Sequence, residues 1–327
     1  MQHNLQQIKK KNNLNMPIYI ISILIVISSV LFLTIGIKSG NMQYALSQRI
    51  PKLVAIVLTG GAIAFSTTVF QTVVDNRLLT PNVMGLDSLY VVVQTALVFL
   101  LGASSTFVVN KKLNFLICVV LMVGASAVLY KLLFKKGKAN IMFLLLIGMI
   151  CGTLFGSLSN FMQKVIDPNE YLILQNKLFA SFNNINVDIL ILALIMILFV
   201  IPFIWDDIKY LDVMSLGRDH AINLGVDYDK LVKKFLIVVS IFIAISTALV
   251  GPLTFLGLLI VNITRQMMKT YKHTYLITVS ILVSIFTLVF GQLIVERVFK
   301  VSTPVSVIIN LIGGIYFMYL LLKESKL

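Results

Sequence analysis

The sequence predicts an all-α membrane protein with about ten transmembrane helices in a single domain (residues 1–327), and three observations support this. Of the 327 residues, 58% are hydrophobic and only 12% are charged, with a mean hydropathy of +0.97. Soluble proteins carry about 25% charged residues, so the ordinary globular classes are excluded. Apolar stretches recur along the whole chain, and each span needs about 20 such residues. Ten spans would use almost the whole sequence, which leaves no room for a soluble catalytic domain.

Eight apolar stretches without charged residues fit one span each. They run over 17–37, 53–74, 89–109, 113–130, 139–163, 189–205, 274–295 and 301–322. A longer run, 235–264, would form a helix of about 45 Å against a hydrocarbon core of about 30 Å. Gly251 and Pro252 stand near its middle, where a proline interrupts the helical hydrogen bonds. The run therefore predicts two spans, with the second helix continuing past Arg265.

The distribution of cations predicts the orientation. The chain has 27 Lys and Arg against 13 Asp and Glu, a net charge of +14. A cytoplasmic N-terminus places 18 of the 27 cations on the inner side, as the positive-inside bias favours, and puts both termini in the cytoplasm. Most cations flank apolar runs, so the expected partner of this charge is membrane lipid and not nucleic acid.

Side chains that support chemistry are scarce in the spans. Asp87 and Asp188 stand at span ends, and Cys118 and Cys151 lie inside apolar runs without metal-ligand spacing. Proton-coupled carriers need buried carboxylates or histidines, so this composition argues against proton coupling, whereas sodium coupling through backbone carbonyls stays open. The sequence predicts neither a metal site nor a bound cofactor, and a cytoplasmic partner is the expected source of energy.

One long polar segment, residues 206–234, lies between the spans on the inner side. Its apolar residues follow an amphipathic pattern that Gly217 and Gly225 interrupt, which predicts two short helices joined by a glycine turn. The pattern fits both a solvated connector and a docking surface for a cytoplasmic motor.

Four segments in order resemble the permease subunits of ATP-binding-cassette (ABC) importers for iron–siderophore complexes, haem and cobalamin. They are RIPKLVAIVLTGGAIAFSTTVFQTVVDNRLLTPNVMGLDS from Arg49, SLGRDHAINLGV from Ser215, GPLTFLGLLIVNITRQ from Gly251 and TPVSVIINLIGGIYFMYLLL from Thr303. The resemblance covers nearly the whole chain. It departs from the family at Val261–Asn262, where a Pro-His pair is usual, and at Gly313–Ile315, where Gly-Ala-Pro is usual. The catecholate-siderophore branch tolerates such changes and shares the GLDS motif.

The resemblance implies a bacterial cell-membrane subunit with the fold of the cobalamin-importer permease, which is not itself an enzyme. Its implied partners are a second permease, with a heterodimer favoured, two copies of a cytoplasmic ATPase that binds ATP-Mg, and an extracytoplasmic siderophore-binding protein. Segment 206–234 then becomes the loop that couples to the ATPase. Its expected coupling residues are Ser215, Leu216, Gly217, Arg218, Ala221, Leu224 and Gly225.

Two further sets of residues acquire roles only through the resemblance. Arg49, Lys52 and Arg297 are expected to meet acidic lobes of the binding protein, although interfacial anchoring also fits them. The fifth and tenth spans are expected to line the pathway, although helix–helix hydrogen bonding fits their polar residues equally. Those residues are Ser157, Ser159, Asn160, Gln163, Ser306 and Asn310. The main rival function is an ion-coupled carrier or channel that acts without an ATPase.

Overall fold

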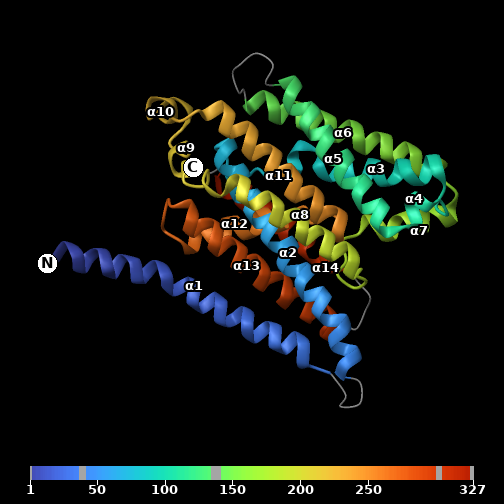
Figure 1. The fold of residues 1–327 in the computed structure, drawn as a ribbon, viewed down its shortest axis with the longest axis horizontal. Helices are drawn as coiled ribbons and strands as arrows, with labels where there is room; N and C mark the ends of the chain where they lie inside the picture. Colours follow the sequence, from blue (N-terminus) through green and yellow to red (C-terminus); the bar gives the residue numbers. More distant parts are fainter. Residues whose placement is uncertain (1, 37–41, 134–140, 300–303, 325–327) are drawn as a thin grey trace.

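The regular structure of the chain is helical throughout the described residues, 2–36, 42–133, 141–299 and 304–324 of the computed structural model (Figure 1). The ends of three predicted spans, residues 37, 139–140 and 301–303, lie outside these ranges, as do residues 1 and 325–327. The elements are α1 (Gln2–Thr34), α2 (Met42–Val74), η2 (Pro81–Met84), α3 (Leu86–Leu101), α4 (Thr106–Val109), α5 (Lys111–Leu133), α6 (Ile141–Val165), α7 (Pro168–Leu178), α8 (Val187–Trp205), α9 (Tyr210–Met214), α10 (Arg218–Asn223), α11 (Tyr228–Val250), α12 (Leu256–Met267), α13 (His273–Ile294), η3 (Val295–Phe299) and α14 (Val305–Glu324).

The predicted all-α polytopic fold is confirmed. Seven helices in the described part of the chain are long and apolar enough to cross a membrane, namely α1, α2, α5, α6, α8, α11 and α13. The three other predicted spans correspond to shorter helices, α3, α12 and α14. The predicted span 89–109 differs in its bounds, because Gly102 adopts φ 78° and ends α3, and α4 follows as a separate turn.

The break predicted in 235–264 is also confirmed. Helix α11 ends at Val250, and Gly251 adopts φ 98°, a left-handed conformation that strongly favours glycine. Helix α12 begins at Leu256 and ends at Met267, beyond Arg265 as expected. The apolar run is therefore divided between the end of α11, a helix of 23 residues, and α12, a helix of 12 residues.

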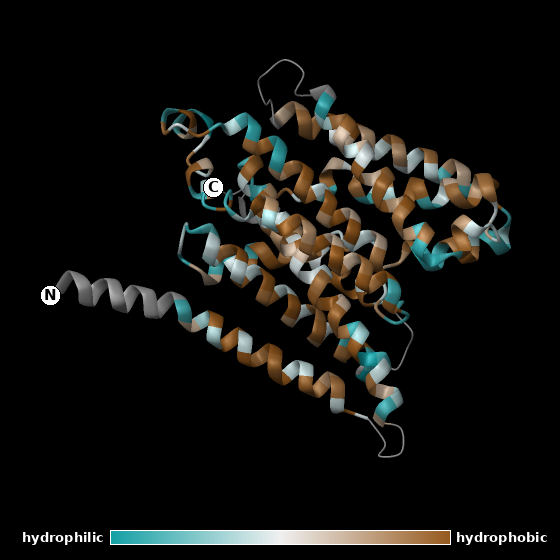
Figure 2. Cartoon of the chain, viewed as in Figure 1, coloured by the Kyte–Doolittle hydropathy of each residue, from teal (hydrophilic) through white to brown (hydrophobic). Residues whose placement is uncertain are grey.

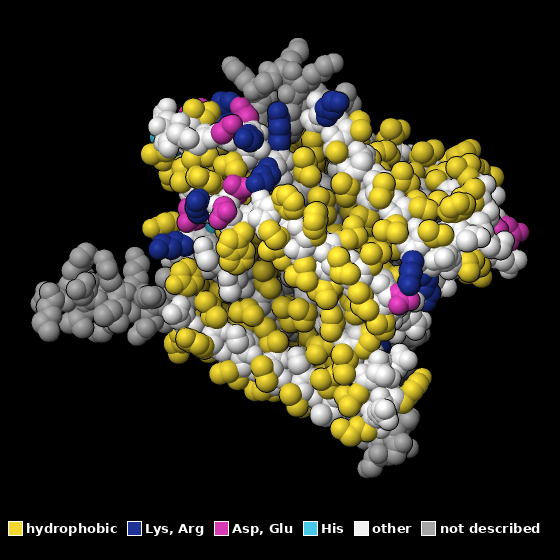
Figure 3. All heavy atoms as spheres, in the orientation of Figure 1, with side chains coloured by type: hydrophobic (Ala, Val, Ile, Leu, Met, Phe, Trp, Pro, Cys, Tyr) yellow, Lys and Arg dark blue, Asp and Glu magenta, His cyan; other side chains and the backbone are white. Residues whose placement is uncertain are grey.

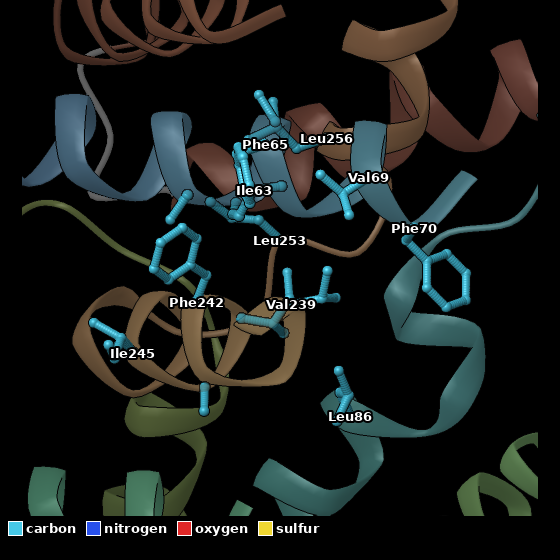
Figure 4. Close-up of a cluster of buried hydrophobic side chains, with 14 of the residues drawn as sticks. Ile63, Phe65, Val69, Phe70, Leu86, Val239, Phe242, Ile245, Leu253 and Leu256 are labelled. Carbon is cyan, nitrogen blue, oxygen red and sulfur yellow. The ribbon is translucent and has the colours of Figure 1, made fainter. Parts of the chain in front are cut away.

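Helix α2 forms the centre of the bundle. It packs mainly against α11 and α13, and all its residues from Ala62 to Val74 are buried. Figure 4 shows this core, where the rings of Phe65 and Phe242 meet edge-on with centroids 5.4 Å apart. Around it, α1 lies along α13, and α3, α5 and α6 form a second group beside α11 (Figure 1). The outward faces are largely apolar, as a lipid-facing surface requires (Figures 2 and 3).

Glycines allow the chain before α3 to lie directly on α6. Gly85 adopts φ 79°, and a Cβ built on Gly148 would lie 2.8 Å from the Cα of Met84. A Cβ on Gly152 would lie 3.1 Å from the Cα of Gly85. By contrast, a Cβ on Gly156 would meet nothing within 4 Å in this chain. The backbone of η2 and Gly85 therefore contacts α6 as closely as small residues permit.

We expect Gly148→Ala to lower the stability of the folded chain by about 1–3 kcal/mol, because overpacking forces the η2 backbone away from α6. The matched variant Gly156→Ala, on the same helix, leaves stability unchanged or raises it. Thermal unfolding of both variants in detergent measures the difference. Equal melting temperatures for the two variants would show that the close approach contributes nothing.

Candidate functional site

The polar segment after α8 forms two short helices, as the sequence predicts. Gly217, with φ 95°, lies between α9 and α10, and Gly225, with φ 83°, follows the end of α10. Residues 228–234 belong to the first turns of α11, so the segment outside the long helices is 206–227, here named the α9–α10 loop. Both glycines occupy the left-handed region, where other residues are strained. The two glycines therefore set the angle between the short helices and α11.

Ion pairs hold the α9–α10 loop to the start of α11. Arg218 Nη2 lies 3.0 Å from Asp229 Oδ2, and this hydrogen bond, together with the carboxylate charge, raises the pKa of Arg218. Lys234 pairs with Asp207, which follows α8. Charged hydrogen bonds of this kind fix orientation as well as adding stability. These pairs join the solvent-exposed loop to α11 at two points, Asp207 and Arg218.

The α9–α10 loop exposes apolar side chains. Leu216 is 57% exposed and Leu224 is 64% exposed, whereas Ala221, within α10, is completely buried. A groove of about 430 Å³ lies between them, lined by Leu216, His220, Asn223 and Leu224. Charged side chains gather around this projection, at the upper left of Figure 3. Of the seven expected coupling residues, the two leucines can contact a partner, and Ser215 donates to the carbonyl of Asp212 at 2.7 Å. The other four, Gly217, Arg218, Ala221 and Gly225, shape the loop.

The three cations Arg49, Lys52 and Arg297 come together at the opposite end of α2 and α13. Arg49 Nη1 donates to three carbonyl oxygens at the end of α1, those of Phe32 (3.1 Å), Leu33 (2.9 Å) and Ile35 (3.0 Å). Arg297 also donates to the carbonyl of Ile35, and Lys52 lies 3.1 Å from Glu296. The cations therefore hold the C-terminus of α1, where positive charge is favourable. We name these three residues the outer basic cluster.

The six expected pathway residues are not brought together within this chain. Ser157 and Asn160 are exposed on α6, while Ser159 donates to the carbonyl of Phe155 in the same helix, at 2.8 Å. Gln163 donates to Thr95 on α3 at 3.3 Å, and Ser306 donates to the carbonyl of Ala180 at 2.8 Å. Asn310, on α14, has a buried side-chain oxygen without a partner among the described residues. Helices α6 and α14 lie well apart (Figure 1).

A cavity of about 950 Å³ opens at the end that carries the outer basic cluster. It is formed where α3, α5, α7, α8 and α11 end or begin, and none of the six expected pathway residues lines it. Lys177 points into this region and donates to the carbonyl of Val108 at 2.8 Å. Burial lowers the pKa of Lys177, with the nearby Lys111 acting in the same direction. Amide groups, including those of Asn176 and Asn184, make most of the remaining polar lining.

Sequence reasoning missed the contacts of three side chains, Asp87, Asp212 and His273. Asp87 stands at a span end as expected, but its Oδ1 is buried without a partner among the described residues, and its Oδ2 accepts from Thr254 at 2.7 Å. Asp212 and His273 meet although 61 positions separate them. The motif GLDS marks Asp87, whereas no pattern in the sequence connects Asp212 with His273.

Comparison with known proteins decides the family. The profile of the FecCD transport family matches residues 14–323. The chain belongs to the FecCD transport family. The resemblance found in the four sequence motifs is thereby confirmed, siderophore branch included.

Two relatives of this FecCD chain are petrobactin permeases, and a solved structure of another transporter shares its fold. It is 58% identical to the petrobactin import system permease protein YclO of Bacillus subtilis over 88% of this chain and 91% of that protein. It is 36% identical to the petrobactin import system permease protein FatC of Bacillus anthracis, over 90% of this chain and 83% of that protein. A metal-chelate type ABC transporter solved in an inward-facing conformation has the same fold, with a TM-score of 0.82 and 23% identity over 95% of this chain and 99% of that one.

We expect Arg49→Gln to lower the melting temperature of the purified chain by several degrees. The substitution removes a charged donor from three carbonyls, and such bonds contribute about 1–3 kcal/mol. Lys112→Gln is the matched control, because the Lys112–Asp188 pair is exposed and such pairs contribute little. If the control unfolds as early as Arg49→Gln, the attachment of α1 does not depend on Arg49.

Proposed function

We propose that this chain is the permease subunit of an ABC importer that carries a ferric catecholate siderophore of the petrobactin type into the cytoplasm. The observation that supports the proposal most strongly is the 58% identity to the petrobactin permease YclO across most of both chains. FatC, a second relative above 30% identity, is also named as a petrobactin permease. The chain itself acts in transport and is not an enzyme.

The α9–α10 loop is the proposed coupling loop for a cytoplasmic ATPase. Leu216 and Leu224 project from an ordered pair of short helices, and an amphipathic helix of this kind fits into an apolar groove. ATP-Mg would be bound by two copies of that ATPase, with no cofactor on this chain. The loop then faces the cytoplasm, which agrees with the excess of cations on the same side and places both termini there.

The proposed assembly contains a second, different permease. Bacillus subtilis has two petrobactin permeases, YclO and YclN, to which this chain is 58% and 23% identical. Bacillus anthracis likewise has FatC and FatD, at 36% and 25%. The chain thus resembles one of each pair, which favours a heterodimer. The exposed polar residues Ser157 and Asn160 on α6 would then face a pathway completed by the other subunit.

The outer basic cluster is the proposed contact for an extracytoplasmic siderophore-binding protein. Its three cations face a single carboxylate, Glu296, so this end keeps an excess of positive charge. Charges at the rim of an interface mainly accelerate and orient association, and salt screens them. The internal bonds of Arg49 and Arg297 hold these guanidinium groups in place for that contact.

The direct test is uptake into proteoliposomes that contain both permeases and the ATPase. We expect ferric petrobactin to accumulate only when ATP is supplied on the ATPase side and the binding protein on the other side, and to be unaffected when ionophores collapse ion gradients. Accumulation driven by a sodium gradient without ATPase would instead establish the rival, an ion-coupled carrier.

The docking role of the loop is tested with Leu216→Asp and Leu224→Asp. Each places a charge on an exposed apolar contact, so the amount of ATPase that co-purifies with the permease should fall at least about tenfold, equivalent to about 1.4 kcal/mol. Leu172→Asp is the matched control, since Leu172 is equally exposed but lies on α7. Undiminished co-purification in both loop variants would remove the loop from the interface.

A further inference from the structure

Asp212, in α9, is joined to the first residue of α13 by two hydrogen bonds. Its Oδ1 accepts from the backbone N–H of His273 at 2.7 Å and from His273 Nδ1 at 2.7 Å. Because a carboxylate only accepts hydrogen bonds, Nδ1 carries the proton in this contact. Helix α9 is therefore bonded to both the backbone and the side chain of α13.

The same imidazole continues the connection to α2. His273 Nε2 lies 2.8 Å from Thr72 Oγ1, two residues before α2 ends, and the ring is only 3% exposed. Thr72 Oγ1 also lies 2.9 Å from the carbonyl oxygen of Thr68. Its single proton goes to Nε2 when the ring is neutral, and to the Thr68 carbonyl when Nε2 is protonated and donates to the hydroxyl. Packing adds to the connection, since α9 contacts α2 directly and Leu211 and Met214 are buried.

These contacts differ from the other attachments of the α9–α10 loop. The Arg218–Asp229 and Lys234–Asp207 pairs join the loop to α11, its own continuation in sequence. Only the Asp212–His273–Thr72 chain, among the hydrogen bonds described for this loop, reaches the central pair α2 and α13. That pair runs the full height of the bundle, from Thr72 and His273 to Lys52 and Glu296 at the opposite end.

We propose that His273 is a positioning residue for energy coupling, which locks α9 to α2 and α13 through Asp212 and Thr72, so that displacement of the loop moves these two helices as one body. The inference rests on the proposed function, because it needs an ATPase that displaces the loop. A polar chain centred on a buried imidazole suits this role, since leaving a buried polar group such as His273 or Thr72 unpaired is costly. Coupling between the loop and the α2–α13 pair thus depends on one identifiable contact, Asp212–His273–Thr72.

The test is a double-mutant cycle on uptake per ATP hydrolysed, with the complete transporter in proteoliposomes. Asp212→Ala and His273→Ala should each lower this ratio at least fivefold, about 1 kcal/mol, while ATPase still co-purifies. The double variant should be no worse than the poorer single variant, because both remove the same link. Lys112→Ala with Asp188→Ala, an exposed pair far from the loop, should change nothing.

Two conservative variants keep the test decisive if the alanine variants do not fold. His273→Asn retains an amide donor near the position of Nδ1 but has no counterpart of Nε2, so it should recover only the part of the uptake per ATP that depends on Asp212. Thr72→Val, which keeps the shape but loses the hydroxyl, breaks the same contact with Nε2 and should lower uptake per ATP to a similar extent. Wild-type ratios in all folded variants, or additive losses in the cycle, would overturn the inference while leaving ATP-driven uptake established. Absence of ATP-driven uptake in the wild type would instead overturn the proposed function.

Discussion

Burial of α2 across the bundle is the constraint on which the other elements depend. The segment of α2 from Ala62 to Val74 is buried, so it must satisfy its backbone internally and can keep polar side chains only where they find partners. Thr59 and Thr68 meet this demand by donating to carbonyls one turn earlier, and Thr72 meets it through His273. With α2 fixed, α11 and α13 pack on it from two sides, and the remaining helices add outer layers. The α9–α10 loop and the outer basic cluster then occupy opposite ends of the same central unit.

The fold was predictable wherever the signal is local. Apolar runs identified the seven helices long enough to cross a membrane and the shorter helices α3, α12 and α14. Gly251 and Pro252 identified the break before α12, and Gly217 and Gly225 identified the two loop helices. Helix α7 was missed because it is not markedly apolar, and its signal is a short-range cap in which Asp167 accepts from Asn169. The span at 89–109 was drawn too long because the turn at Gly102 lies within an apolar stretch.

The site was predictable only in part, because contacts between distant segments leave no pattern in a single sequence. The exposure of Leu216 and Leu224 follows from their amphipathic setting, and the basic residues were recognisable as a set. Their partners were not: Arg49 bonds carbonyls of α1, and His273 bonds a carboxylate 61 positions away. A lone histidine in a polar stretch gives no sign that folding will bury it between α9 and α2.

The central claim is that the α9–α10 loop and the α2–α13 pair move as one rigid body. Spin labels at Lys209, beside α9, and at Thr278, on the exposed side of α13, report this directly in a cysteine-free background. The account predicts that their separation stays constant within about 2 Å, the scale of small interface shifts, between the nucleotide-free and ATP-trapped transporter. A larger change in this distance on ATP trapping would contradict it, because the loop would then move independently of the helices it is said to drive.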